Sequence, residues 1–380
     1  MRRLLKNIIC YIFAFALCVG GVYLSRNNYD YAYYTGAQLP EIDDLIFLTF
    51  SEAVDEKLEY YTEPEPVIRD FVKRRVRREV IIGAVGDLTL ASNYNKPYAN
   101  SFDYFYDKYG AEHFFKYIGE VFERFDISVA NLEGVLSDND DPSIRVDKQF
   151  SYRGRKQYAE ILRLGGIDIV NLANNHTFDY GQIGFDDTII ALEAAGVGYF
   201  GYDMILIKEV NGLRLGFIGA VGSANISSSR LQFFQSQLDY LDRQGVDLKI
   251  FSFHWGNNDE LLQNANQILL GRFLIDNGAD LVLGHHPHVL QGIELYNGRY
   301  IVYSLGNFIF DGNVVSDIEH RTSIIFQIKF VFEGEELIST EVELIPILVS
   351  SERWRNNFQP ILAEGDMYDY ILRKIAERSP

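Results

Sequence analysis

Imidazole, carboxylate and amide side chains are concentrated in five short polar segments of this sequence, and each segment follows an apolar run. The segments hold five of the seven histidines in the chain, and no cysteine lies in any of them. Oxygen and imidazole ligands without thiolates suit a divalent ion such as Mn, Fe or Zn. The segments are Gly86-Asp87, Asn131-Leu132-Glu133, Asn171 to His176, His254-Trp255-Gly256 and Gly284 to His288.

These segments supply enough ligands for two divalent ions. A two-metal site needs a bridging carboxylate and neutral ligands on each side. Taken singly, each segment also has a structural explanation, such as a turn, a helix cap or a packed histidine. Three histidines within Gly284 to His288 favour metal binding even alone. The predicted metal ligands are Asp87, Glu133, Asn175, His254, His286 and His288.

The elements that must position these residues alternate between short apolar runs and helix-like segments, which predicts an α/β domain. In such folds ligands bind beyond the carboxyl ends of the strands, where the polar segments fall. Residues 322–348 predict a closing hairpin. The predicted strands lie at 80–85, 127–130, 167–172, 215–218, 248–253, 281–283 and 300–304. The predicted helices lie at 102–125, 156–164, 184–195 and 261–277.

The N-terminus predicts a membrane anchor. Ile8 to Leu24 carries no charge, and basic residues precede it, which favours a cytoplasmic N-terminus and an extracytoplasmic main domain. A cleaved signal peptide and a buried core helix are the alternatives, although no good cleavage site is evident. Both cysteines, Cys10 and Cys18, lie in this segment, so the rest of the chain is free of thiols, as suits a protein outside the reducing cytoplasm.

We expect four regions along the 380 residues. Residues 1–26 form a cytoplasmic tip and transmembrane anchor, and 27–79 a stalk or linker. Residues 80–348 form the main domain, and 349–380 a C-terminal tail. The formal net charge of −18 should repel nucleic acid, so none is expected as a partner.

The five segments, together with Gln291, Glu294 and the run from Tyr303 to Phe308, resemble the CapA (PGA_cap) family of bacterial capsule and poly-gamma-glutamate synthesis. The resemblance covers roughly residues 80–348. Because that family is similar to the calcineurin-like metallophosphoesterases, it implies a four-layer αββα sandwich with two metal ions.

The resemblance also implies a role for each site residue. Asp87 and His288 would bind the first metal, Glu133 would bridge, and the second metal would take Asn175, His254 and His286. His176 would protonate the leaving oxygen or stabilise the transition state, with Asp179 orienting it.

Two departures from the phosphoesterase pattern weaken the inference to ordinary phosphatase turnover. Thr89 stands where that pattern has a histidine ligand, and the bridging position holds Glu133 in place of an aspartate.

The function that the resemblance implies is a membrane-anchored, extracytoplasmic, metal-dependent component of capsule or poly-gamma-glutamate synthesis. Its expected partners are an anionic extracellular polymer or its precursor and a membrane synthase complex. Two alternatives stay open: a phosphoesterase or other hydrolase that uses metal-activated hydroxide, and a non-catalytic scaffold of the synthase complex. The sequence thus leaves open whether the protein is an enzyme.

Overall fold

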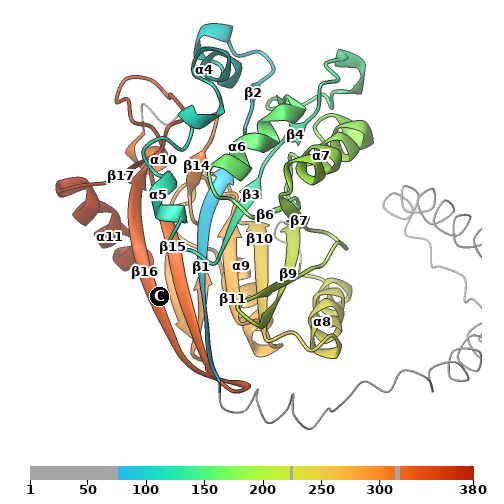
Figure 1. Ribbon diagram of the computed structural model, residues 1–380, viewed down its shortest axis with the longest axis vertical. Helices are drawn as coiled ribbons and strands as arrows, with labels where there is room; N and C mark the ends of the chain where they lie inside the picture. Colours follow the sequence, from blue (N-terminus) through green and yellow to red (C-terminus); the bar gives the residue numbers. More distant parts are fainter. Residues whose placement is uncertain (1–75, 223–225, 313–316) are drawn as a thin grey trace, which may run out of the picture. The chain divides into compact units, whose positions relative to one another are not determined.

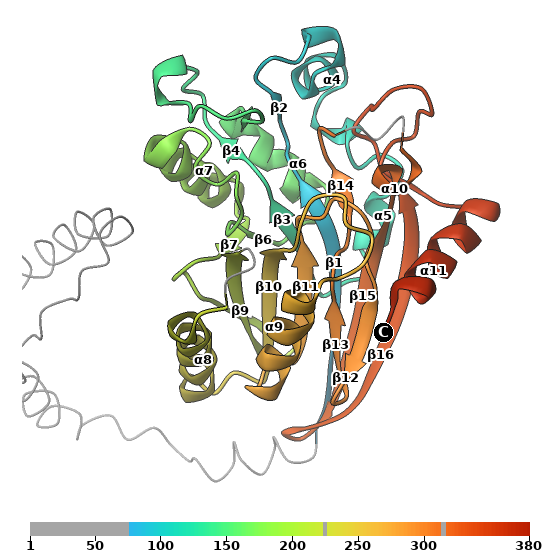
Figure 2. The same cartoon turned by 180° about the vertical axis from the view of Figure 1, so that it is seen from behind.

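The computed structural model describes residues 76–222, 226–312 and 317–380. Two mixed β-sheets lie face to face, and helices cover their outer faces (Figures 1 and 2). The α/β class expected from the sequence is therefore confirmed. The expected anchor and nearly all of the stalk lie outside the described residues. Within the described ranges, no helix is both long enough and apolar enough to cross a bilayer.

The larger sheet has the order β17-β16-β15-β1-β3-β6-β7, and β14 also pairs with β1. Strands β1, β3, β6 and β7 run parallel, and β15 and β16 add antiparallel strands beside β1. The expected closing hairpin is confirmed as β15 and β16. The strands are β1 (Arg77–Leu88), β3 (Ile127–Leu132), β6 (Ile169–Asn171), β7 (Gly198–Phe200), β14 (Asn307–Ile309), β15 (Thr322–Glu333), β16 (Glu336–Leu348) and β17 (Ile361–Leu362).

The second sheet has the order β12-β13-β11-β10-β9-β8, with parallel pairing from β9 through β13 and antiparallel edge strands. A separate three-stranded sheet has the order β2-β5-β4. The strands of the second sheet are β8 (Leu206–Val210), β9 (Leu213–Gly222), β10 (Leu248–Trp255), β11 (Leu281–His285), β12 (Ile293–Tyr296) and β13 (Arg299–Val302), and those of the small sheet are β2 (Ser92–Asn93), β4 (Val135–Leu136) and β5 (Tyr152–Gly154).

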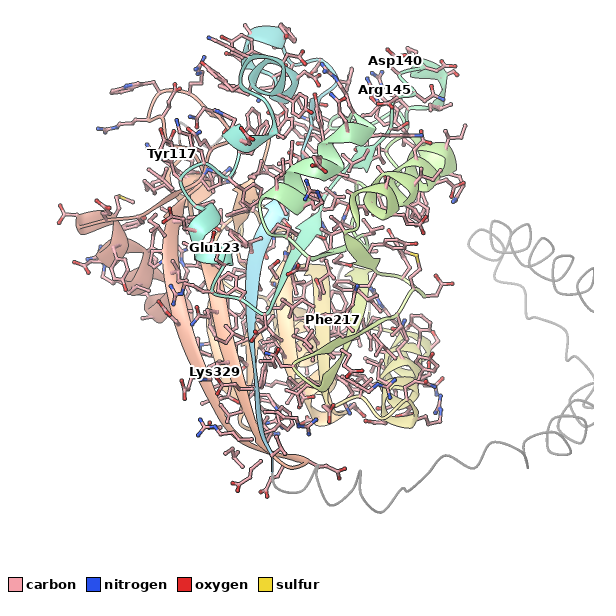
Figure 3. All side chains as sticks on the ribbon, viewed as in Figure 1. Tyr117, Glu123, Asp140, Arg145, Phe217 and Lys329 are labelled. Carbon is pink, nitrogen blue, oxygen red and sulfur yellow. The ribbon has the colours of Figure 1, made fainter. Side chains whose placement is uncertain are left out.

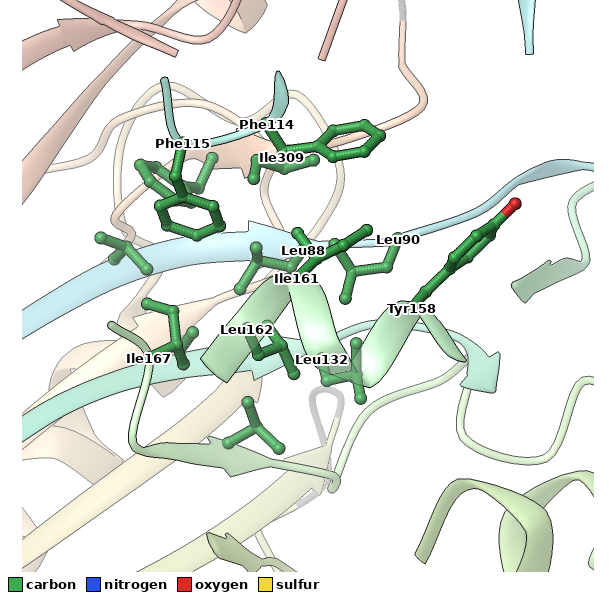
Figure 4. Close-up of a cluster of buried hydrophobic side chains, with 14 of the residues drawn as sticks. Leu88, Leu90, Phe114, Phe115, Leu132, Tyr158, Ile161, Leu162, Ile167 and Ile309 are labelled. Carbon is green, nitrogen blue, oxygen red and sulfur yellow. The ribbon is translucent and has the colours of Figure 1, made fainter. Parts of the chain in front are cut away.

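The alternation of side chains along the strands builds three apolar layers. In β1, Ile82 and Ala84 point into the layer between the sheets, whereas Val85 and Leu88 point to the outer layer. Figure 4 shows Leu88 in that outer layer with side chains of β3 and α6. In β10, Ile250 belongs to the layer between the sheets, and the outer face of its sheet carries a third cluster.

The outer layers are completed by helices: α4 (Phe102–Tyr109), α5 (Gly119–Phe122), α6 (Ala159–Leu164) and α7 (Gly181–Ala195) on the larger sheet, and α8 (Ser228–Arg243) and α9 (Ala265–Asp276) on the second. Short α10 (Ile318–Arg321) precedes β15, and α11 (Asp366–Arg378) contacts β16 and β12. Ile371 and Ile375 of α11 are buried in the layer between the sheets. Segment 349–380, expected to be a tail, therefore includes a helix packed on the core.

One expected helix, 102–125, is corrected by the structure. Helix α4 ends at Tyr109 because Gly110 adopts a positive φ of 76°, a conformation that glycine tolerates and that ends helices. A 3₁₀ turn and short α5 follow in place of a continuous helix. Helix α8 and strands β8, β12 and β14 were not predicted from the sequence.

Candidate metal centre

The polar segments meet at the carboxyl ends of five strands. Asp87 lies next to the end of β1, and Glu133 directly follows β3. Asn175 follows β6, His254 is the penultimate residue of β10, and the histidines that end and follow β11 complete the set. Strands from both sheets thus deliver their side chains to one place, as the sequence predicted.

Asp87 is fully buried and fixed from several sides. Its Oδ1 accepts a hydrogen bond from Asn131 Nδ2 at 2.8 Å, and its Oδ2 accepts one from the backbone N–H of His286 at 3.2 Å. His285 Nδ1 and His288 Nδ1 lie 3.3 Å from its two oxygens. Although burial would raise the pKa of Asp87, these two histidines hold it well below its usual value, so the carboxylate is ionised.

The glycine before Asp87 lets the loop that leads into β14 approach. A Cβ on Gly86 would lie 1.9 Å from the carbonyl oxygen of Gly306, and that carbonyl accepts a hydrogen bond from Asp87 N at 3.0 Å. Asp87 and Asn307 are partners in the parallel pair β1 and β14. The Gly-Asp pair therefore belongs to a close contact between strands, which places Asp87 beside the loop of Asn307.

Three neutral side chains converge at a second point. His254 Nε2 lies 2.6 Å from Asn175 Oδ1 and 3.0 Å from His286 Nδ1. Burial, together with the neighbouring His286, holds the pKa of His254 well below its usual value. Burial and His288 lower the pKa of His286 to about 4. Both imidazoles are therefore neutral at pH 7, the form that binds a metal ion.

Glu133 is the feature that best fits a bound cation. Its side chain is fully buried, and within the described residues neither carboxylate oxygen has a hydrogen-bond partner. Burial raises its pKa well above the usual value. A buried carboxylate without donors is costly, and a divalent ion would satisfy both oxygens. The nearest imidazole nitrogens, on His176, His254 and His288, lie 3.7, 3.8 and 3.8 Å from Oε1.

His288 is held by the loop of β14. Its Nδ1 lies 3.1 Å from Asn307 Oδ1, and Asn307 Nδ2 donates to the His288 carbonyl at 3.1 Å. Burial would lower the pKa of His288, but the carboxylates of Glu133 and Asp87 raise it to about 9. His286 and His288 both adopt positive φ, 97° and 59°, on either side of Pro287. Non-glycine residues rarely do so, and such strain clusters at functional sites.

The ligand atoms form two overlapping groups, each within 4.8 Å: Glu133 with His286 and His288, and Asp87 with Glu133 and His254. Glu133 belongs to both groups, which is the place a bridging carboxylate needs. The structure thus brings all six sequence-predicted ligands together, and the donor set of oxygens and imidazoles fits divalent ions.

His176 and Asp179 lie at the edge of this cluster. His176 Nδ1 is 2.8 Å from Asp179 Oδ2, and Asp179 also accepts from the backbone N–H of Tyr152 at 2.7 Å and forms an ion pair with Lys148. The contact with Asp179 places the proton of neutral His176 on Nδ1, because the carboxylate only accepts. Nε2 is then the nitrogen turned toward Glu133. Burial lowers the pKa of His176, against the opposing effect of Asp179.

Sequence reasoning named these motifs but missed the roles of several amides inside them. Asn131 Nδ2 donates to Asp87 and lies 3.3 Å from His254 Nδ1. The Oδ1 of Asn131 accepts from Asn171 at 3.2 Å and from Asn174 at 3.4 Å. The signal for this amide layer is the recurrence of asparagine at the carboxyl ends of β3 and β6.

Thr89, which stands where the phosphoesterase pattern has a histidine, is buried, and its hydroxyl forms hydrogen bonds with backbone groups. Its hydroxyl accepts from the backbone N–H of Asp311 at 3.0 Å. Asp311 in turn pairs with Lys96. This position therefore links β1 to the segment after β14.

A cavity of about 590 Å³ opens beside the cluster. His176 and His288 line it on the side of the cluster, and the rings of Phe150, Tyr152 and Phe310 form apolar walls. A small molecule or one segment of a polymer fits such a volume.

Fold and site together define a class: an α/β protein of two packed sheets with a candidate divalent-metal centre at the strand ends. The family described as "Bacterial capsule synthesis protein PGA_cap" matches residues 81–312, which include every predicted ligand, and the chain belongs to this family.

Two relatives carry names from the same field. "Capsule biosynthesis protein CapA" of Bacillus anthracis is 29% identical over 262 residues, which are 63% of this chain and 62% of the relative. "PGA biosynthesis protein CapA" of Bacillus subtilis is 31% identical over 221 residues, 53% of this chain and 58% of the relative. The match spans about three fifths of each relative's length.

Among solved structures, the protein TT1561 of Thermus thermophilus is similar at a TM-score of 0.39 with 10% sequence identity, and the match covers 70% of this chain and 98% of that one. A similarity of that size adds nothing to the assignment of the site.

Proposed function

We propose that this protein is a membrane-anchored, extracytoplasmic component of capsule or poly-gamma-glutamate synthesis that works through a divalent-metal centre of the metallophosphoesterase type. The observation that carries the proposal is Glu133, a buried carboxylate without hydrogen-bond partners in the described residues, ringed by histidines inside the segment that matches the PGA_cap family. The names of the two relatives support the process, and the ligand cluster supports the metal.

The chemistry of the site can be divided among its own residues. Divalent ions, when bound, would supply positive charge that polarises an oxygen of the substrate. Asp87 and Glu133 would hold the ions by charge, and Asn175, His254, His286 and His288 would complete their ligand sets. The ions would also reconcile an acidic protein with an anionic polymer.

His176 would move the proton. Asp179 holds its Nδ1 at 2.8 Å, so Nε2 is left to take a proton from an oxygen in the adjoining cavity and, once protonated, to give it to an oxygen of the substrate. This arrangement favours hydrolysis or transfer at a phosphorus or acyl centre as the second candidate function.

The anchor and the location rest on the uncharged run from Ile8 to Leu24 with basic residues before it. They predict that the metal centre works outside the cytoplasm, next to a membrane synthase complex that makes the polymer.

The proposal is tested by complementation. A strain that lacks this protein would receive the full-length wild type, Glu133→Gln or His286→Ala/His288→Ala, and surface polymer and membrane-bound protein would be measured in each strain. We expect the wild type to restore the polymer, and both variants to fail at normal protein abundance. Restoration by the variants would contradict metal dependence and support the scaffold alternative.

A further inference from the structure

A second cavity, of about 380 Å³, lies next to the one beside the metal centre. Both cavities are lined by Asn93 and Lys96. The three-stranded sheet separates them, because neighbouring residues of β5 point to opposite faces. Tyr152 turns its ring to His176 at a centroid distance of 4.8 Å, and Arg153, next in the strand, lines the second cavity.

Two guanidinium groups line this second cavity, those of Arg145 and Arg153. Each is partly buried and lies over an aromatic ring: Arg145 is 3.6 Å from the ring centroid of Tyr94, and Arg153 is 5.7 Å from that of Tyr180. Arg153 also donates to the Ser137 carbonyl at 2.8 Å. Stacking on a ring holds a guanidinium plane in place and leaves its N–H edges available to an anion.

Among the described residues, neither Arg145 nor Arg153 forms an ion pair with a carboxylate, whereas the cations around them do. Lys148 pairs with Asp179, Arg155 with Asp107 and Lys156 with Asp187. In a chain with a net charge of −18, two guanidiniums that line one cavity and have no carboxylate partner among the described residues are unusual.

Two carboxylates also line the cavity. Asp103 is engaged by Arg155 and by the hydroxyl of Tyr158. Asp140 is exposed at the rim and opposes an incoming anion. Figure 3 shows Asp140 and Arg145 near one another, at the end of the molecule away from the turn that joins β15 and β16.

We infer that this second cavity is an anion subsite that binds carboxylates of an extended acidic chain, with Arg145 and Arg153 as the binding residues. The identity of this acidic chain as the polymer rests on the proposed function. A polymer that crosses the shared rim at Asn93 and Lys96 would place one segment beside the metal centre and another between the two guanidiniums. The subsite would thus hold the polymer in position without taking part in the chemistry.

The test is binding of a short γ-linked glutamate oligomer to the full-length protein in neutral detergent, measured by calorimetry with chelator present. The loss of two charge-assisted bidentate contacts in Arg145→Gln/Arg153→Gln should raise Kd about tenfold or more. Asp140→Asn, which removes the opposing charge, should lower Kd. Arg373→Gln, a charge change of the same sign on exposed α11, should leave Kd unchanged.

Other outcomes would overturn the subsite. These are unchanged binding in the double arginine variant, no binding by the wild type, equal binding of a neutral glutamine oligomer, and binding of inorganic polyphosphate without binding of glutamate chains. His286→Ala/His288→Ala separates this inference from the proposed function. The subsite requires that this variant keep its affinity for the oligomer, and the metal centre requires that it fail in complementation.

Discussion

At the scale of single residues, the electrostatics of the site depend on Glu133. In the metal-free protein its carboxylate is buried without donors among the described residues, and its pKa lies well above the usual value because of that burial. The same negative charge helps to raise the pKa of His288 to about 9. Both shifts mean that the folded, metal-free protein binds protons more tightly at these groups than the unfolded chain does.

The first prediction follows from the sign of these shifts. A group whose pKa rises on folding stabilises the protein below its unfolded pKa, and that stability is lost as the pH rises through the folded value. In chelator, the unfolding free energy of the wild type relative to Glu133→Gln should therefore fall as the pH rises from about 4 to 9, by more than about 1 kcal/mol. Urea unfolding of both proteins across this pH range measures the difference. If the unfolding free energy of the wild type relative to Glu133→Gln stayed constant or rose with pH, the raised pKa of Glu133 and His288 in the folded protein would be contradicted.

The second prediction separates His176 from the metal ligands. His176 contacts Asp179 directly and lies 3.7 Å from Glu133, so it stands at the edge of the ligand cluster. His176→Ala should bind as much metal as the wild type and have the same melting temperature with metal. It should nevertheless fail to restore polymer in the complementation strain. His288→Ala should lose both metal and polymer. Loss of metal in His176→Ala would make His176 a ligand and overturn its role in proton transfer.

At the scale of elements, the strands that carry the candidate ligands were predicted from the sequence better than the helices and edge strands that connect and flank them. The strands that deliver Asp87, Glu133 and His254 were found because buried parallel strands are continuous apolar runs. Edge strands such as β8 and β12 were missed because charged residues interrupt their short apolar patterns. The helix expected over 102–125 ends before Gly110, because the positive φ of this glycine is incompatible with a continuing helix.

Within the site, too, only the features that a local sequence pattern encodes could be predicted. The six predicted ligands share residue types that metals bind, so their motifs could be found in the sequence. The hydrogen bonds of Asn131 and Asn307 depend on pairing between strands far apart in the chain, β1 with β3 and β1 with β14. No local pattern encodes that pairing.

The third prediction concerns the close approach of β14 to β1. In Gly86→Ala the new Cβ would lie 1.9 Å from the Gly306 carbonyl, and backbone has to move to admit it. We expect a loss of about 1–3 kcal/mol in unfolding free energy and weaker metal binding, because Asp87 and Asn307 both shift.

Gly119→Ala is the matched control, since its nearest contact would be 3.9 Å away within a helix, and alanine favours the helix. Thermal melts and metal titrations of the two variants make the comparison. Normal metal affinity in Gly86→Ala would show that the β14 contact does not position the site.

At the scale of the whole molecule, two sheets bring five strand ends to one place and leave a cavity on one side of the small sheet and a second cavity on the other. Residue 77, where β1 begins, lies at the other end of the larger sheet from the ligand cluster, as Figures 1 and 2 show for β1. The domain thus presents its polar loops at the end away from the start of β1.

Binding of divalent metal by the strand-end cluster can be measured directly. The full-length protein would be purified without chelator and measured by elemental mass spectrometry, beside His286→Ala/His288→Ala and the control His113→Ala, whose ring contacts Asn357 and not the cluster. We expect about two ions per chain in the wild type and the control, and none in the double variant. A wild-type protein that holds no metal, even after loading with excess Mn²⁺ and Zn²⁺, would contradict metal binding by this cluster.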